Sequence, residues 1–486
     1  MYRTYMLRVG ISTLGRGRAG WPAWVLMLLR GRRGQTLAYA CFFVTALVMR
    51  SVSDLSTHRL WADCAIVGYG VALAVSLVSL PVLSGRRRAR VAFGAATAGA
   101  LLVPLALLLT GRYGVQNEVT IIEQSAAVLL STGTPYVHDA STLDQINPYL
   151  PGMALFGVPA VVAGMVGDGL GQVWVAALTD PRIWCLLVAL VSAGAALRLH
   201  RVRSRWARAA MFLSLLSPTV ALEMSTSGVD LPLAGLLVLG IALAGAGRVK
   251  SAALALAGAL ALKWVAVIAV PVVALLVLRQ EGRRRAAEFL AVCTAAFGVL
   301  LVSALVSVVD MVAQVVRFPA GVGVVATPAR SPMPGVLLAS TGSVGRACAL
   351  VLLAVAATAI AVLVIRRPPR TAGRAYVYAG IGFVAFFLLA PTGRFGYMVI
   401  PVMLFGAAYA TSRLVNRPAD SGEHPAVTPD VAPPDHATSD AMSRNDHGPF
   451  PRPCNGMPRA IIRRCTPLRS RARCPDWRGN RSVSQG

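Results

Sequence analysis

The chain has 486 residues, of which 56% are hydrophobic and only 14% are charged. Soluble domains typically contain about 45–50% apolar and about 25% charged residues, so this composition excludes an ordinary soluble domain. The formal net charge of +27 would suit a nucleic-acid partner. The arginines, however, occur in short runs between apolar segments, which is the pattern of cytoplasmic loops in membrane proteins. We therefore expect an all-α polytopic protein of the lipid bilayer, with no nucleic-acid partner.

The two ends of the chain differ from its apolar middle. Residues 1–34 are basic and are interpreted as a cytoplasmic arm, because Arg and Gly residues interrupt any run that could serve as a cleavable signal peptide. Residues 35–415 form the predicted transmembrane domain. Residues 416–486 are rich in Pro, Ser, Asp and Arg and lack periodicity, so we expect a disordered basic cytoplasmic tail.

Apolar segments approaching the length of about 20 residues that crosses a bilayer recur between the two ends. Two of them depart from a simple span. Segment 150–166 is expected to be juxtamembrane or re-entrant. Only one crossing fits between residue 111, which is expected on the outer face, and the basic run 198–208, which is expected on the inner face, and segment 182–198 is assigned to it. Segment 251–278 has basic flanks at both ends, so it should form two short helices hinged near Lys263. The other expected spans are 35–50, 62–84, 91–110, 182–198, 207–222, 231–246, 287–308, 346–365, 374–390 and 397–413.

Together these segments predict about 12 transmembrane helices with both termini in the cytoplasm. Every loop assigned to the inner face is basic, as the positive-inside rule requires. The high content of Ala, Gly and Arg suits a bacterial plasma membrane. The first large outer loop, 111–181, is acidic instead, with Arg112 as its one basic residue against six carboxylates.

This outer loop contains the residues best suited to chemistry. Residues 118–131 predict an amphipathic helix lying along the membrane interface, with Glu118 in its first turn, where the helix dipole favours a carboxylate. Gly133 and Pro135-Tyr136 break that helix, and Tyr149-Leu150-Pro151 makes a second break. Glu123 is five residues beyond Glu118 and should face elsewhere.

In these motifs and their order the chain resembles the membrane-integral C superfamily of glycosyltransferases, and most closely family 87, the bacterial polyprenyl-phosphate mannosyltransferase type. The resemblance covers residues 91–413. The family commonly has Asp where this chain has Glu118, and its double-Pro turn is reduced here to Leu150-Pro151. The matching elements are Glu118, Leu129-Leu130, Gly133, Pro135-Tyr136, Tyr149-Leu150-Pro151, segment 217–237, the Lys263 hairpin and segment 391–402.

The resemblance implies transfer of a sugar, with mannose as the first expectation, from a polyprenyl-phosphate donor to a glycolipid or polysaccharide acceptor in the cell envelope. Such a transfer needs a base for the acceptor hydroxyl and cations for the departing phosphate. No cofactor and no required metal are expected, because the carboxylates are scattered along the chain. We assign Glu118 as the general base, Arg394, Lys263 and Arg182 to the donor phosphate, and Tyr136, Tyr149, Tyr397 and His138 to substrate binding.

Simpler interpretations compete with these assignments. Glu118 could be a solvated loop acid and Arg394 an interfacial anchor, while Lys263, which has no obvious partner in its apolar segment, could extend to the nearest interface. Asp230 is expected to cap a helix. For the whole chain, the alternatives are a lipid or sugar transporter or flippase, and a non-catalytic membrane protein. The lack of a visible internal repeat and the placement of most acids in loops favour the transferase over the transporter.

Overall fold

The computed structural model describes the chain at residues 31–78, 84–166, 172–202 and 204–412. This part is helical apart from its connecting loops, and its one β-type contact is an isolated bridge between Arg330 and Gly393. The prediction of an all-α fold is confirmed for these residues.

The chain divides into two units, residues 1–422 and residues 423–486. The second unit lies wholly outside the described residues. So do the whole of the predicted tail, 416–486, and all of the predicted cytoplasmic arm, 1–34, except residues 31–34. Both of these assignments stay predictions.

In the described part of the chain, eight helices are long and apolar enough to cross a bilayer, or nine if one bent pair forms a single span. The chain is therefore a multi-pass membrane protein, while the expected total of about 12 spans stays a prediction. The eight are α3 (Gly31–Val52), α4 (Ser56–Leu77), α5 (Gly85–Thr97) continued by η1 (Ala98–Leu102) and α6 (Val103–Leu109), α10 (Pro181–Leu199), η4 (Trp264–Ile268) with α15 (Ala269–Glu281), α16 (Arg283–Leu301) continued by η5 (Val302–Ser307), α17 (Val308–Met311) and η6 (Val312–Arg317), α19 (Ser343–Arg366) and α20 (Ala372–Leu389).

The expected span at 207–222 is bent. Helix α11 (Arg205–Leu215) and helix α12 (Pro218–Thr226) meet at an angle of 56°. The cause is Pro218, which lacks a backbone N–H and whose ring excludes a straight continuation from the preceding turn. The segment expected to span the membrane is therefore two helices that meet at a bend, and its crossing stays a prediction.

The hairpin expected around Lys263 is present. Helix α14 (Val249–Leu262) ends at Lys263, where the backbone is extended (φ −148°, ψ 133°), and the chain then returns through η4 and α15. The start of α14 and the end of α15 lie side by side, as shown by Gly247, just before α14, which faces the carboxylate of Glu281. Lys263 consequently sits at the turn, at the far end of both helices.

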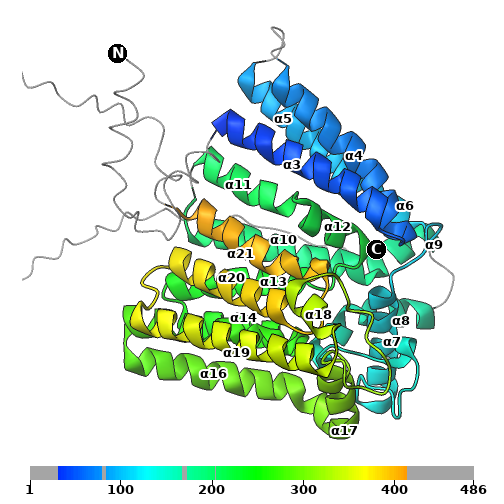
Figure 1. The fold of residues 1–486 in the computed structure, drawn as a ribbon, viewed down its shortest axis with the longest axis vertical. Helices are drawn as coiled ribbons and strands as arrows, with labels where there is room; N and C mark the ends of the chain where they lie inside the picture. The colour runs from blue at the N-terminus through cyan, green and yellow to red at the C-terminus, as the bar shows by residue number, and fades with distance from the viewer. Residues whose placement is uncertain (1–30, 79–83, 167–171, 203, 413–486) are drawn as a thin grey trace, which may run out of the picture. The chain divides into compact units, whose positions relative to one another are not determined.

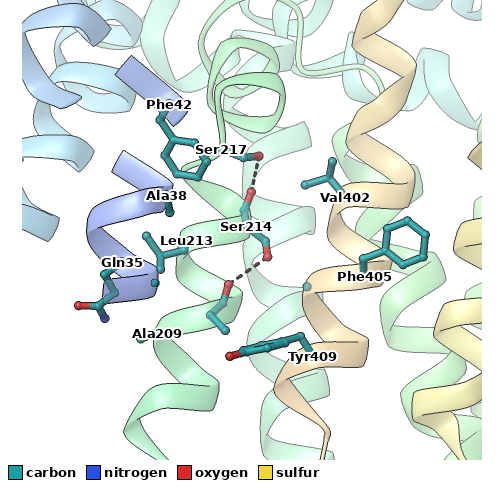
Figure 2. Close-up of a pocket in the computed structure, with 13 residues that line it drawn as sticks. Gln35, Ala38, Phe42, Ala209, Leu213, Ser214, Ser217, Val402, Phe405 and Tyr409 are labelled. Atoms are coloured by element: carbon teal, nitrogen blue, oxygen red, sulfur yellow. Dashed lines mark hydrogen bonds between the residues drawn. The ribbon is translucent and has the colours of Figure 1, made fainter. Parts of the chain in front are cut away.

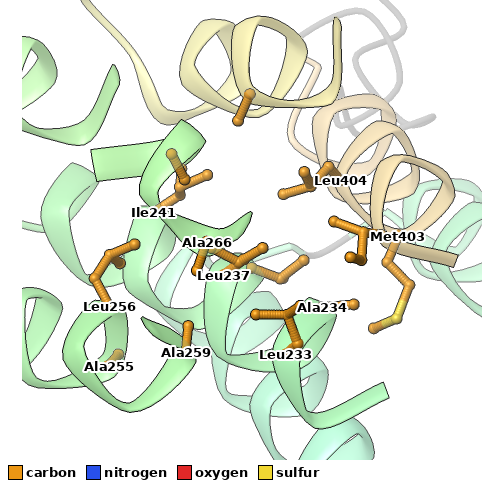
Figure 3. Packing of buried hydrophobic residues seen from close by; sticks show 14 of the residues in the cluster. Leu233, Ala234, Leu237, Ile241, Ala255, Leu256, Ala259, Ala266, Met403 and Leu404 are labelled. Atoms are coloured by element: carbon orange, nitrogen blue, oxygen red, sulfur yellow. The ribbon is translucent and has the colours of Figure 1, made fainter. Parts of the chain in front are cut away.

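Helix α13 (Leu231–Gly245) lies at the centre of the main core. It packs against α10, α14, α20 and α21 (Val399–Ala410), and almost all of its residues are buried. Figure 3 shows how small side chains such as Ala234 and Ala259 alternate with Leu237 and Ile241 where these helices meet. In lipid, close packing of small residues replaces the hydrophobic effect as the main attraction between helices.

Helices α3, α4 and α5 form a second cluster beside the main core (Figure 1). Helix α4 approaches η1 closely, because Gly68 and Gly99 face each other and a Cβ on Gly99 would lie 2.5 Å from the Cα of Gly68. Buried polar groups join this cluster to its neighbours: Trp61 donates to the carbonyl of Ala100 at 2.8 Å, and the Tyr69 hydroxyl donates to that of Leu216 at 2.6 Å.

A cavity of about 310 Å³ lies between α3, α11 and α21. Its wall is mainly apolar, with Phe42, Leu213 and Val402 among the lining residues (Figure 2). The two serine hydroxyls drawn there, on Ser214 and Ser217, both donate to carbonyls of their own segment. These hydroxyls are therefore already satisfied within the protein.

The short helices gather at one end of the main bundle, called here the loop-rich end (Figure 1). The helix predicted at residues 118–131 is present as α7 (Asn117–Thr132), which ends at Gly133 in the left-handed conformation (φ 79°); its position along the membrane interface stays a prediction. The predicted juxtamembrane segment 150–166 forms two short helices, η3 (Pro151–Phe156) and α8 (Val158–Val166), both too short to span. Helix α9 (Gln172–Thr179) and helix α18 (Pro334–Ala339) complete this end.

The glycine contact between α4 and η1 predicts opposite outcomes for two similar substitutions. Gly99→Ala should lower the thermal unfolding midpoint in detergent, because the added methyl group meets backbone atoms; overpacking of this kind costs about 1–3 kcal/mol. Gly94→Ala is the matched control, since an added Cβ there meets no described heavy atom within 4 Å. It should leave the midpoint unchanged or raise it slightly. Equal midpoints for the two variants would contradict the close approach.

Candidate functional site

A cavity of about 420 Å³ opens at the loop-rich end. Its wall is built from the first turn of α7, the Lys263 turn, the loop at 316–329, helix α19 and the turn before η7 (Phe395–Met398). Five residues assigned from the sequence line it together: Glu118, Arg394, Lys263, Tyr149 and Tyr397. A sixth polar residue on this wall, Asp230, had been assigned only a capping role.

Glu118 and Arg394 form an ion pair across the cavity. Glu118 stands in the first turn of α7, where the helix dipole stabilises its carboxylate. Arg394 precedes η7 in an extended conformation, and backbone hydrogen bonds of Gly393 with Ala329 and Ser331, both 2.9 Å, fix its turn. The Glu118 side chain is 15% exposed and that of Arg394 36%, so part of the guanidinium faces open space.

Lys263 forms the second ion pair of the cavity, with Asp230. The Nζ atom lies 2.5 Å from Oδ1, and the two side chains are only 13% and 4% exposed. The ammonium also lies 5.0 Å from the ring centre of Tyr149 and 5.1 Å from that of Tyr397, within cation–π distance. Two predictions are corrected here: Lys263 has a partner, and the Asp230 carboxylate contacts Lys263 instead of capping α13. The cause is the fold, which brings the start of α13 to the end of α14.

A third carboxylate, Glu223, lies behind the Arg394 turn. It accepts a hydrogen bond from the hydroxyl of Ser227, and its Oε1 occupies the space that a Cβ on Gly396 would need. Gly396 therefore lets the turn that carries Arg394 and Tyr397 rest directly on this carboxylate. Sequence reasoning overlooked Glu223, although an ionisable residue inside an apolar segment is by itself a reason to expect a functional role.

The other wall of the cavity is apolar. It includes Phe386, Phe387 and Ile400 from the core side, and Leu350 from α19. Leu350 is 48% exposed, so the apolar wall extends to the surface of α19. The cavity therefore combines two charge pairs with an apolar wall.

Arg182 lies apart from the cavity in the described part of the chain. Its guanidinium is buried and binds the carboxylate of Asp180, which also accepts from the Arg182 backbone at 2.8 Å. The structure therefore does not bring Arg182 together with the other residues assigned to the donor phosphate, because its guanidinium is paired with Asp180 two residues away. Glu123 faces this same pair, and burial followed by the charge of Asp180 raises its pKa above the ordinary value.

Tyr136 also lies outside the cavity wall of the described residues. Its buried hydroxyl donates to the carbonyl of Tyr149 at 3.1 Å. It thus supports Tyr149 from behind rather than contacting a ligand in the cavity. Two buried amides reinforce this arrangement: Asn147 donates to the carbonyl of Pro135, and Gln314 on η6 donates to that of Val137. The loop at 135–149 is thereby fixed to η6, which the sequence did not indicate.

His138 is likewise outside the cavity wall as the described residues form it. Its Nδ1 lies 3.0 Å from a carboxylate oxygen of Asp310, and its Nε2 lies 3.3 Å from Asp139. The ligand atoms of these three residues lie within 4.8 Å of one another, a spacing that a metal ion could use. Each imidazole nitrogen already faces a carboxylate, which is the arrangement of a protonated histidine, so we assign no metal here.

The start of α7 is held by α4. His58 lies 2.7 Å from the side-chain amide of Gln116, the residue that precedes α7, and the hydroxyl of Ser56 donates to the carbonyl of Tyr113. These contacts fix the position from which Glu118 enters the cavity. Helix α4 therefore helps to position the α7 carboxylate.

No protein-family model, curated protein or solved structure matches this chain. The functional argument consequently depends on the geometry of the cavity.

The buried pair predicts a large stability difference. Asp230→Asn should destabilise the protein by about 3–5 kcal/mol, because it leaves the Lys263 ammonium buried without a counter-charge. The measurement is the denaturant or thermal unfolding midpoint in detergent. Asp63→Asn is the control, since it breaks an exposed ion pair with Arg50 that is worth about 0–1 kcal/mol. Equal losses for the two variants would refute the buried pairing.

The His138 contacts predict a pH-dependent attachment of the loop. The hydrogen bond with Asp310, and then the charge of Asp139, raises the pKa of His138 above its ordinary value of about 6.5. Because the protonated form is favoured in the folded state, the attachment is complete below the ordinary pKa and is lost as the pH rises through the raised one. Hydrogen exchange of residues 137–147 should therefore increase with pH more steeply than in His138→Gln. Parallel pH profiles for the two proteins would count against this attachment.

Proposed function

We propose that this protein is a membrane glycosyltransferase that moves a sugar from a polyprenyl-phosphate donor to an acceptor hydroxyl. The observation that supports it is the grouping of Glu118, Arg394 and Lys263 on one cavity that also has an apolar wall. These are a candidate base, two cations and a passage for a lipid tail. A soluble sugar nucleotide would have no use for that apolar passage.

The chemistry assigns each group a role. Glu118 is the base that accepts the proton of the acceptor hydroxyl, and Arg394 is the cation that binds the donor phosphate and stabilises it as it leaves. Lys263 adds a fixed positive charge at the base of the cavity, held by Asp230 and two tyrosine rings. Tyr149 and Tyr397 offer flat faces of the kind on which a sugar ring stacks.

The apolar wall suits the donor's prenyl chain. A chain that enters beside Leu350 would run along Phe386 and Phe387 toward the two cations. Because this chain would come from the lipid, the apolar wall keeps it in apolar surroundings while the phosphate reaches the cations. We further propose that the loop-rich end lies on the extracytoplasmic side of a bacterial plasma membrane, as the basic loops at the opposite ends of the helices favour. Mannose is the first sugar to test.

The proposal predicts the loss of transfer in one variant and its survival in another. Membranes from cells that express the protein are given a radiolabelled polyprenyl-phosphate sugar, and labelled glycolipid or polysaccharide is measured. Glu118→Gln should lower the rate by about 10²–10⁴-fold, the contribution typical of a general base. Glu123→Gln is the matched control, because it lies on the same helix but faces Asp180 and Arg182. Its rate should stay near that of the unaltered protein. Full activity in Glu118→Gln would rule out this base.

A second candidate function is movement of a lipid-linked sugar between the two leaflets. The buried pair of Lys263 and Asp230 favours it, because transporters place paired charges deep between their helices. The two functions differ in product. A flippase changes the leaflet of the labelled lipid without breaking the sugar–phosphate bond, whereas the transferase consumes the lipid and labels the acceptor.

A further inference from the structure

The two ion pairs of the cavity differ in how readily an incoming anion can reach them. The Lys263 and Asp230 side chains are 13% and 4% exposed, and two tyrosine rings flank the ammonium. Arg394 is 36% exposed and faces the cavity beside Glu118. An anion that enters the cavity therefore meets the Arg394 guanidinium first, and finds it occupied by a carboxylate.

A base that is held in an ion pair is not free to accept a proton from an acceptor hydroxyl. Glu118 in this conformation directs one carboxylate oxygen at the guanidinium. A guanidinium binds phosphate and carboxylate through the same planar fork of N–H donors, so the two anions compete for it. The geometry thus links the state of the base to the presence of a phosphate.

We propose that the Glu118–Arg394 ion pair is a latch that the donor phosphate opens, so that the base becomes available only after the donor has bound. This inference rests on the proposed function and adds an order of events to it. The phosphate takes Arg394, and Glu118, released from it, turns to the acceptor hydroxyl. Without a donor, the carboxylate stays paired and the site is inactive.

The transfer step then balances in atoms and charge. The acceptor oxygen attacks the anomeric carbon, and the bond from that carbon to the phosphate oxygen breaks, leaving its electron pair on the phosphate. The hydroxyl proton passes to Glu118. The phosphodiester monoanion becomes a phosphomonoester dianion as Glu118 becomes neutral, so the net charge of the cavity does not change. A neutral Glu118 no longer competes for Arg394, which stays with the phosphate while its charge grows.

The latch makes an unusual prediction about binding. If Glu118 competes with phosphate, then Glu118→Gln should bind a polyprenyl monophosphate more tightly than the unaltered protein, by about twofold to fivefold, the range of a partly exposed ion pair. The measurement is the dissociation constant for a short-chain polyprenyl monophosphate with the purified full-length protein in detergent. Glu118→Gln should thus lose turnover while it gains affinity.

Three further variants complete the test. Arg394→Gln should weaken binding, and the gain from Glu118→Gln should vanish in the double variant, because both act on one contact. Glu123→Gln should leave affinity unchanged. Glu118→Asp, one methylene shorter, should also bind more tightly while keeping some activity; it serves as the second variant if Glu118→Gln does not fold.

The outcomes separate the latch from the function itself. Unchanged or weaker binding in folded Glu118→Gln and Glu118→Asp, with Arg394-dependent binding in the unaltered protein, overturns the latch and leaves the transferase proposal intact. Failure of the unaltered protein to bind polyprenyl monophosphate overturns both.

Discussion

The site depends on the ion pair between Lys263 and Asp230. A lysine in an apolar segment must find a counter-charge, because an isolated buried ion is too costly to retain. The chain meets this requirement by ending α14 at Lys263 and starting α13 at Asp230, so that both ends arrive at one point. That pairing joins the hairpin turn to the start of α13 at the base of the cavity, where the rings of Tyr149 and Tyr397 flank the ammonium. Its role in specifying the turn is independent of any catalysis.

The elements with a strong local signal could be predicted from the sequence. Helix α7, its end at Gly133 and the turn at Lys263 follow from amphipathic spacing, a left-handed glycine and basic flanks, all of which act within a few residues. The sequence also identified five residues of the cavity. What it could not provide is pairing over long separations: Asp230 with Lys263, Gln314 with the loop at Val137, and Glu223 beneath Gly396. Arg182 shows the opposite case, since it pairs with Asp180 only two residues away and lies outside the cavity wall of the described residues.

The helices before residue 91 illustrate how the position of a site residue depends on distant contacts. By sequence they lie outside the resemblance, yet the ring of His58 meets Gln116, and the hydroxyl of Ser56 meets the loop just before α7. The glycine contact between α4 and η1 then ties this cluster to the helix that leads into the same loop. A carboxylate at the first turn of α7 can only meet Arg394 if that turn is held in place. Helix α4 is thus part of the site's scaffold.

The charge arrangement also limits which ligands the cavity accepts. Two cations and two carboxylates make its polar end formally neutral, and in a poorly solvated space each charge depends on its partner. A neutral sugar cannot replace either carboxylate, so it leaves both pairs intact. A free anion can replace Glu118 at Arg394 but gains nothing from the apolar wall. An anion with an apolar tail would use both halves of the cavity, and this is the physical reason for proposing a lipid-linked phosphate as its ligand.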